Sequence, residues 1–167
     1  MPTVTNSKDP DLYHHQHLKG RLFGSENPFS LGDASLIQEL VNLWGISDIL
    51  VLTQWAPPPC DVAVHWHHVP IQGTPGMATI ERTNAILTDC LGREGRAWVY
   101  CERGIDRTGC VIGCFLVSRG QDPHSVIDLL VSHAAGRLNH KDLKYVLGPS
   151  YAPILDYAGR DRPGRPG

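Results

Sequence analysis

One stretch of this chain limits its local fold more than any other: Cys-Glu-Arg-Gly-Ile-Asp-Arg-Thr-Gly at residues 101–109, set between two apolar segments. The segment before it, residues 96–100, predicts a short buried strand, and residues 108–118 predict a helix that is apolar on all sides. A tight loop between a strand and a helix directs several backbone N–H groups at one point, and the helix dipole adds positive potential there. The stretch therefore predicts an anion-binding loop.

The side chains of this loop add reactive chemistry to anion binding. We expect Cys101 to be present largely as the thiolate, because positive potential favours the charged form. Arg107 can bind two oxygens of a phosphate through its planar guanidinium, and Gly104 allows close approach of the backbone. A nucleophile and a phosphate-binding arginine on one loop are the groups that phosphoryl transfer through a cysteinyl-phosphate intermediate requires.

The loop and its surroundings resemble the cysteine-based protein tyrosine phosphatase superfamily, in its compact dual-specificity branch. The similarity covers roughly residues 22–147: Gly-Ile at 45–46 leads into an apolar strand, Val-Pro at 69–70 ends the next strand, and a helix precedes the loop. The resemblance implies that Cys101 is the nucleophile, that Arg107 stabilises the transition state and that Thr108 helps the thiolate to leave. It also implies a reaction without metal or cofactor, and phosphate binding by Glu102, Arg103, Gly104, Ile105, Asp106 and Arg107.

Two positions depart from the pattern of that family. Tyr100 stands where the family often has a histidine that tunes the thiolate. The general-acid aspartate of the family usually follows the Val-Pro pair closely, but residues 69–76 read Val-Pro-Ile-Gln-Gly-Thr-Pro-Gly and contain no acid. The leaving oxygen of an alkyl ester still has to receive a proton, so another donor is needed.

Three groups are candidates for that donor. Asp106 lies in the loop itself, and Gly-x-Asp-Arg-Thr is similar to the loops of myotubularin-type lipid phosphatases, where this aspartate has been proposed as the acid. Asp61 follows a proline-rich loop, and a histidine of residues 65–68 is the third candidate. Each has a purely structural alternative: Asp106 can hydrogen-bond the loop, Asp61 can be a turn residue, and the histidines can simply alternate along a strand.

Protein phosphotyrosine, phosphoserine or phosphothreonine is the substrate class that the resemblance favours. The alternatives are a phosphoinositide phosphatase, an RNA 5′-phosphatase and a phosphate-binding module without turnover. Glu102 and Asp106 offset Arg103 and Arg107, whereas a site for highly charged inositol phosphates usually has more lysine in the loop. The formal net charge of −2 argues against general nucleic-acid binding.

The length and the order of the expected elements indicate one main domain. A chain of 167 residues, 41% of them hydrophobic, fits one domain with a real core. Strands alternating with helices, followed by helices, predict an α/β three-layer sandwich with a mainly parallel central sheet and helices on both faces. We expect a polar N-terminal arm over residues 1–18, a phosphatase domain over 19–158 and a disordered tail over 159–167.

The N-terminal arm contains His14, His15 and His17, which could contact a metal, although a solvated arm is the expected interpretation. The chain has no run of eighteen apolar residues and its N-terminus has no apolar signal core, so we expect no membrane span and no secretion. Five cysteines without framework spacing suit a reducing compartment. We therefore expect a cytoplasmic protein whose partner is a phosphorylated substrate.

Overall fold

A five-stranded sheet forms the centre of the computed structural model, which describes residues 12–138 and 148–160. The strand order is β1–β2–β5–β3–β4. β2, β5, β3 and β4 run parallel, and β1 pairs antiparallel with β2 at the edge. The strands are His14–His17 (β1), Leu22–Ser25 (β2), Asp48–Val51 (β3), His65–His68 (β4) and Ala97–Tyr100 (β5).

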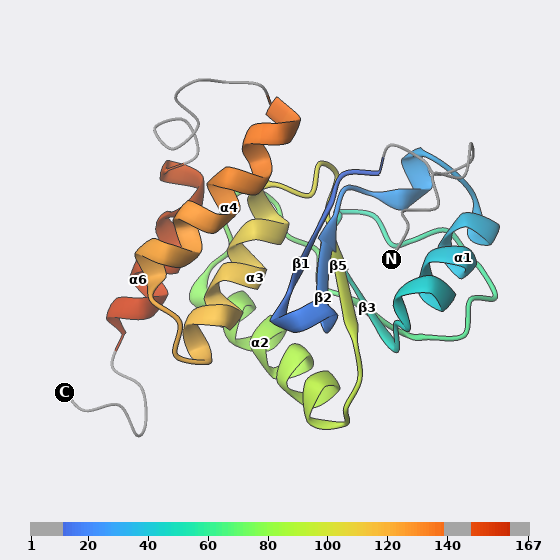
Figure 1. Cartoon of the computed structure of the whole chain (residues 1–167), viewed down its shortest axis with the longest axis horizontal. Helices are drawn as coiled ribbons and strands as arrows, with labels where there is room; N and C mark the ends of the chain where they lie inside the picture. Colours follow the sequence, from blue (N-terminus) through green and yellow to red (C-terminus); the bar gives the residue numbers. More distant parts are fainter. Residues whose placement is uncertain (1–11, 139–147, 161–167) are drawn as a thin grey trace.

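Helices cover both faces of this sheet (Figure 1). One α-helix, Ala34–Trp44 (α1), packs on one face. The opposite face carries Met77–Gly92 (α2), Asp106–Ser118 (α3), Pro123–Leu138 (α4) and Ala152–Gly159 (α6). Short 3₁₀ turns are Leu18–Gly20 (η1), Pro28–Ser30 (η2) and Pro149–Tyr151 (η3). The predicted three-layer α/β sandwich with a mainly parallel sheet is confirmed.

The side chains of β5 explain why the sheet needs a cover on each face. Successive residues of a strand point to opposite faces. Trp98 and Tyr100 therefore join the cluster under α1, where Trp44 packs edge-on against Trp98 with ring centroids 5.0 Å apart. Ala97 and Val99 join the larger cluster on the other face, which contains the buried helix α3.

The sequence predicts that the helix α1 begins after an N-cap at Asp33 and stops at Gly45, and the structure has both ends there. The carboxylate of Asp33 accepts a hydrogen bond from the backbone N–H of Ser35 at 2.9 Å and caps the first turn. Gly45 ends the helix with a left-handed φ of +67°. β3 begins three residues later.

The structure differs from the sequence expectation at the N-terminal arm. Residues His14–His17 form the edge strand β1, with His15 and His17 buried and His14 and Gln16 exposed. Because all four residues of β1 are polar, no apolar pattern in the sequence indicates that buried and exposed positions alternate along this strand. The sequence predicts a helix that starts at Asp122-Pro123 and ends before Gly136, but in the structure α4 continues through Gly136 to Leu138. The domain boundaries at 18 and 158 stay predictions.

The sequence also predicts a helix that begins at residues 141–147, but that segment lies outside the described residues. The tail expected at 159–167 lies mainly outside them, and Gly159 is the last residue of α6. Within the described ranges, none of the helices has the length and apolar character needed to cross a membrane.

Candidate active site

The Cys101 loop, residues 101–107, links the end of β5 to the first turn of α3. β3 and β5 end side by side, because Val51 pairs with Tyr100 and the N–H of Leu52 donates to the Tyr100 carbonyl at 2.9 Å. In open α/β sheets, ligands bind beyond the carboxyl ends of the parallel strands. The loop therefore lies at the edge where this fold binds ligands.

Gly104 allows the loop to lie directly on the end of β2. Its φ is +74°, a left-handed conformation that favours glycine. A Cβ atom at this position would lie 2.5 Å from the backbone nitrogen of Glu26 and 2.6 Å from the backbone oxygen of Ser25. Neither neighbour is a flexible side-chain end, so any other residue at 104 would displace the loop from the sheet.

Hydrogen bonds from outside the loop hold three of its backbone carbonyls. The pairs are Glu102 O with the N–H of Asn27 at 3.1 Å, Gly104 O with His15 Nε2 at 3.3 Å and Ile105 O with the Tyr151 hydroxyl at 3.1 Å. In a planar trans peptide group the N–H points opposite to the C=O. The N–H groups of residues 103, 105 and 106 are therefore turned away from these partners, toward the inner side of the loop. Such an arrangement favours an anion.

Cys101 lies beneath this loop with only 2% of its surface exposed. Its Sγ accepts a hydrogen bond from the N–H of Gly104 at 3.2 Å. Thr108, one turn into α3, is fully buried, and its hydroxyl oxygen finds no hydrogen-bond partner among the described residues. Because buried hydroxyls are nearly always paired, this one is available to a partner that the resting site does not provide.

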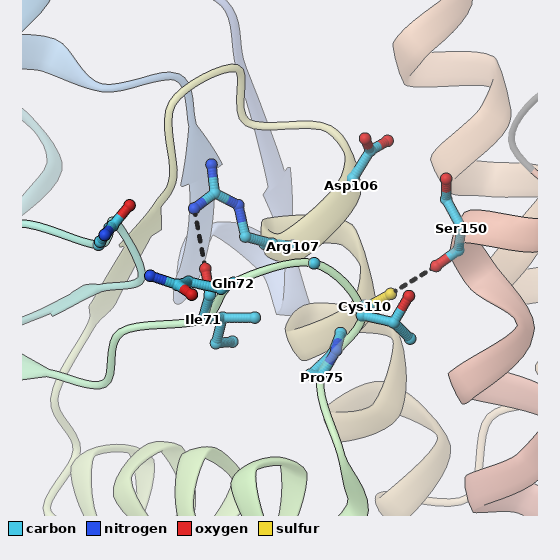
Figure 2. Close-up of a pocket in the computed structure, with 10 residues that line it drawn as sticks. Ile71, Gln72, Pro75, Asp106, Arg107, Cys110 and Ser150 are labelled. Atoms are coloured by element: carbon cyan, nitrogen blue, oxygen red, sulfur yellow. Dashed lines mark hydrogen bonds between the residues drawn. The ribbon is translucent and has the colours of Figure 1, made fainter.

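Arg107 borders a cavity of about 600 Å³ next to the loop. Its Nη1 donates to the Ile71 carbonyl at 3.0 Å, and Figure 2 shows the Asp106 carboxyl turned away from Arg107, on the side of the cavity where Ser150 lies. The cavity is lined by Gln54, residues 71–75, Asp106, Arg107, Cys110 and Ser150. Cys101 is buried and is not among these lining residues, so the structure brings Asp106 and Arg107, but not Cys101, to the cavity.

Cys110 also lines the cavity, but its chemistry differs from that of Cys101. Burial raises the pKa of the Cys110 thiol far above its usual range, and the nearby Cys114 acts in the same direction. The thiol donates to the Ser150 carbonyl at 2.8 Å. Cys110 is therefore a neutral hydrogen-bond donor that joins α3 to the segment before α6.

The other candidate proton donors lie elsewhere or are already engaged. Asp61 is exposed and lines a different hollow beside α1. His67 bonds Asp48 at 2.8 Å between Nε2 and Oδ2, and His68 donates from Nε2 to the Thr53 carbonyl at 2.8 Å. His65 is exposed at the start of β4. Of these candidates, only Asp106 shares the cavity of Arg107.

Sequence reasoning missed the two side chains that hold loop carbonyls. His15 falls in a segment that the sequence predicts to be a solvated arm, and Tyr151 lies 46 residues beyond the carbonyl that it binds. The alternation of His15 and His17 is the one signal that could have indicated a buried strand. For Tyr151 the sequence holds no local signal.

A family model described as "Polymorphic toxin system, DSP-PTPase phosphatase" matches residues 36–121, just over half of the chain. A comparison with curated protein sequences finds no match. Human DUSP28 is a similar solved structure, with a TM-score of 0.62 and 18% identity over 83% of this chain and 88% of that chain.

Two other solved structures are similar to the same degree. A mouse putative dual specificity phosphatase complexed with zinc tungstate has a TM-score of 0.62 and 21% identity over 83% of this chain and 82% of that one. PTPMT1 in complex with PI(5)P has a TM-score of 0.60 and 13% identity over 88% of this chain and 99% of that one. At these identities the similarity shows a shared fold.

Proposed function

The chain belongs to the DSP-PTPase phosphatase family of polymorphic toxin systems, a dual-specificity-like part of the cysteine-based protein tyrosine phosphatase superfamily, and from this premise we propose that it hydrolyses phosphate monoesters through a cysteinyl-phosphate intermediate. The observation that carries the proposal is the loop itself. Its carbonyls are held outward, its N–H groups are turned inward, and the buried sulfur of Cys101 lies beneath it.

In the first step the thiolate of Cys101 attacks phosphorus in line with the ester oxygen. The S–P bond forms, the P–O bond breaks, and the leaving oxygen takes a proton from an acid. Arg107 and the inward N–H groups neutralise the charge on the equatorial oxygens. Within the described part of the chain Arg107 donates from Nη1 to the Ile71 carbonyl, and its other N–H groups are available to the phosphoryl group.

In the second step water attacks the phosphorus of the phosphocysteine. The P–O bond forms, the S–P bond breaks, the sulfur leaves as thiolate, and the proton of the water goes to the carboxylate that gave its proton in the first step. Two donors support this proposal: the N–H of Gly104, which donates to Sγ at 3.2 Å, and the hydroxyl of Thr108, which is buried without a hydrogen-bond partner among the described residues. The reaction requires no metal in this scheme.

Asp106 is the proton donor that we propose for the first step. Its support is the cavity that it shares with Arg107, whereas Asp61 lines a different hollow. An aryl leaving group needs little protonation, so the contribution of Asp106 is expected with alkyl esters.

Phosphorylated tyrosine, serine or threonine in a protein is the proposed substrate, in the cytoplasm, where a reactive thiol stays reduced. The loop carries two acidic and two basic side chains, a balance that disfavours a multiply phosphorylated headgroup. PTPMT1 has been solved in complex with PI(5)P, so a lipid substrate is the second candidate, and an RNA 5′-phosphate is the third.

The test is hydrolysis of a small aryl phosphate in the presence of a chelator. We expect turnover by the wild type and a loss of at least about 1,000-fold in Cys101→Ser, because the nucleophile is removed. Cys60→Ser is the matched control: Cys60 lies beside Asp61 in the hollow near α1, and its variant should keep wild-type activity.

Wild-type turnover that survives in Cys101→Ser would contradict the proposed nucleophile. Absence of turnover in a wild type that still binds inorganic phosphate would make the protein a phosphate-binding module.

A further inference from the structure

We infer that His15, on the edge strand β1, is a positioning residue for the Cys101 loop: it holds the Gly104 carbonyl outward and thereby keeps the N–H of Ile105 directed into the phosphate site. This inference rests on the proposed function of the loop. It gives β1, which lies outside the segment matched by the family model, a part in the reaction.

The protonation of the ring nitrogens follows from their partners. Nε2 of His15 lies 3.3 Å from the Gly104 carbonyl, which can only accept, so Nε2 carries the hydrogen. In the neutral ring Nδ1 is then an acceptor, and it lies 2.7 Å from Nε2 of His17. His17 therefore donates to His15, and His15 donates to the loop. The two hydrogen bonds therefore run in sequence, from His17 to His15 and from His15 to the Gly104 carbonyl.

The ring of His15 is confined on several sides. His133 of α4 stacks on it with ring centroids 5.3 Å apart and planes 24° apart, and His17 meets it edge-on. Gly24 of β2 leaves the room that the ring occupies: a Cβ there would lie 2.8 Å from His15 Nε2 and 2.8 Å from Ile112 Cδ1. Because these neighbours leave the His15 ring little room to rotate, its Nε2–H bond keeps one direction.

The charge state of the histidines keeps this donor unchanged near neutral pH. Burial lowers the pKa of His15 to about 4, against the opposing effect of the hydrogen bond to Gly104. Burial and the neighbouring His15 and His133 lower the pKa of His17 to about 3, and burial also lowers the pKa of His133. The rings of His15 and His17 are therefore neutral near neutral pH.

The conformational freedom of Gly104 explains why the loop needs a hydrogen bond that holds its carbonyl in one direction. Glycine is required where the loop touches β2, but its freedom also allows the peptide group between residues 104 and 105 to rotate. A rotated group would point a carbonyl oxygen, instead of an N–H, at the phosphate. Removing a single preorganised donor from an anion site costs about 100- to 1,000-fold in kcat. If the N–H of Ile105 is only partly misdirected, kcat should fall by a smaller factor.

The test compares three substitutions. His15→Leu removes the donor. His15→Gln can place an amide N–H close to the position of Nε2. His14→Gln is the matched control, because His14 lies on the same strand with its side chain exposed on the other face. The readouts are the dissociation constant for inorganic phosphate, kcat and KM for an aryl phosphate, and the urea midpoint.

We expect His15→Leu to weaken phosphate binding about tenfold and to lower kcat by about 10- to 100-fold, part of the cost of losing one oriented donor. His15→Gln should recover most of both quantities, and His14→Gln should match the wild type. Equal phosphate affinity in His15→Leu and the wild type would overturn the inference. So would equal losses in the Leu and Gln variants, because a role in folding alone does not distinguish them.

If His15→Leu does not fold, His15→Asn replaces it, since its shorter amide does not reach the Gly104 carbonyl. The same loss is expected, and wild-type phosphate affinity would again overturn the inference. Failure of the proposed function would look different: the wild type itself would not turn over the aryl phosphate, while the phosphate-binding comparison would still report on His15.

Discussion

Replacing Gly104 with alanine perturbs the contact that positions the Cys101 loop on the sheet. Two costs combine at this position. A residue with a Cβ in the left-handed conformation costs about 1–2 kcal/mol. Crowding in a packed site typically costs about 1–3 kcal/mol more, and here the crowded atoms are the backbone of Ser25 and Glu26. We therefore expect a loss of roughly 2–5 kcal/mol in the free energy of unfolding if the loop keeps its place.

Gly45→Ala is the control that isolates the first cost. Gly45 has a similar φ of +67°, but the nearest atom to an added Cβ would be Arg96 Cδ at 3.6 Å, an ordinary contact. Urea unfolding of both variants gives the difference in stability, and hydrolysis of an aryl phosphate reports the shape of the loop. Gly104→Ala should lose at least about 1 kcal/mol more than Gly45→Ala, together with most of its activity.

The loop can also yield while the rest of the fold stays intact. The extra loss of stability would then shrink, but the displaced loop would lose activity. A Gly104→Ala variant that is as stable as Gly45→Ala and fully active would refute the reasoning.

Three further predictions concern other parts of the molecule. Tyr151→Phe removes a donor to a loop carbonyl and should weaken inorganic phosphate binding a few-fold, measured by calorimetry, with a stability loss of about 1 kcal/mol; unchanged affinity would contradict the account of the loop. Asp106→Asn should lower kcat for an alkyl phosphate by about 100-fold or more and for an aryl phosphate far less, whereas Asp61→Asn should change neither; equal effects on both esters would exclude Asp106 as the acid. Burial opposes ionisation of Asp48, but hydrogen bonds, that from His67 foremost, outweigh it and lower its pKa to about 2. The stability that Asp48 contributes, about 1–2 kcal/mol relative to Asp48→Asn, is thus present above about pH 4 and lost as the pH falls toward 2, as urea midpoints at several pH values would show.

Much of the fold could be predicted because local signals agree with the tertiary structure. The strand before Cys101 and the buried helix after it are continuous apolar runs, and α1 has an acidic cap at Asp33 and a glycine at its end. The family resemblance drew attention to Cys101 and Arg107, and the structure has the expected strand and helix on either side of their loop.

β1 could not be predicted, for a physical reason. Four polar residues satisfy no apolar pattern, and burying two histidines is favourable only because their ring nitrogens find partners inside the protein. One of these partners, the Gly104 carbonyl, lies 89 residues away from His15 in the sequence. The choice between Asp106 and Asp61 as proton donor also depends on tertiary structure. Spacing in the sequence does not reveal which of the two carboxyl groups shares a cavity with Arg107.

The groups that hydrogen-bond the carbonyls of the Cys101 loop come from residues before and after the loop in the sequence. During synthesis of the chain these groups therefore become available at different times. His15 and Asn27 have left the ribosome before the loop is made, but Tyr151 follows Ile105 by 46 residues. A nascent chain that has just exposed Cys101 therefore carries the reactive residue without the finished anion site. The complete anion site therefore forms late, with the packing of the helices that follow, and a chain cut short before residue 151 would contain the motif without the hydrogen bond from Tyr151 that helps to shape the loop.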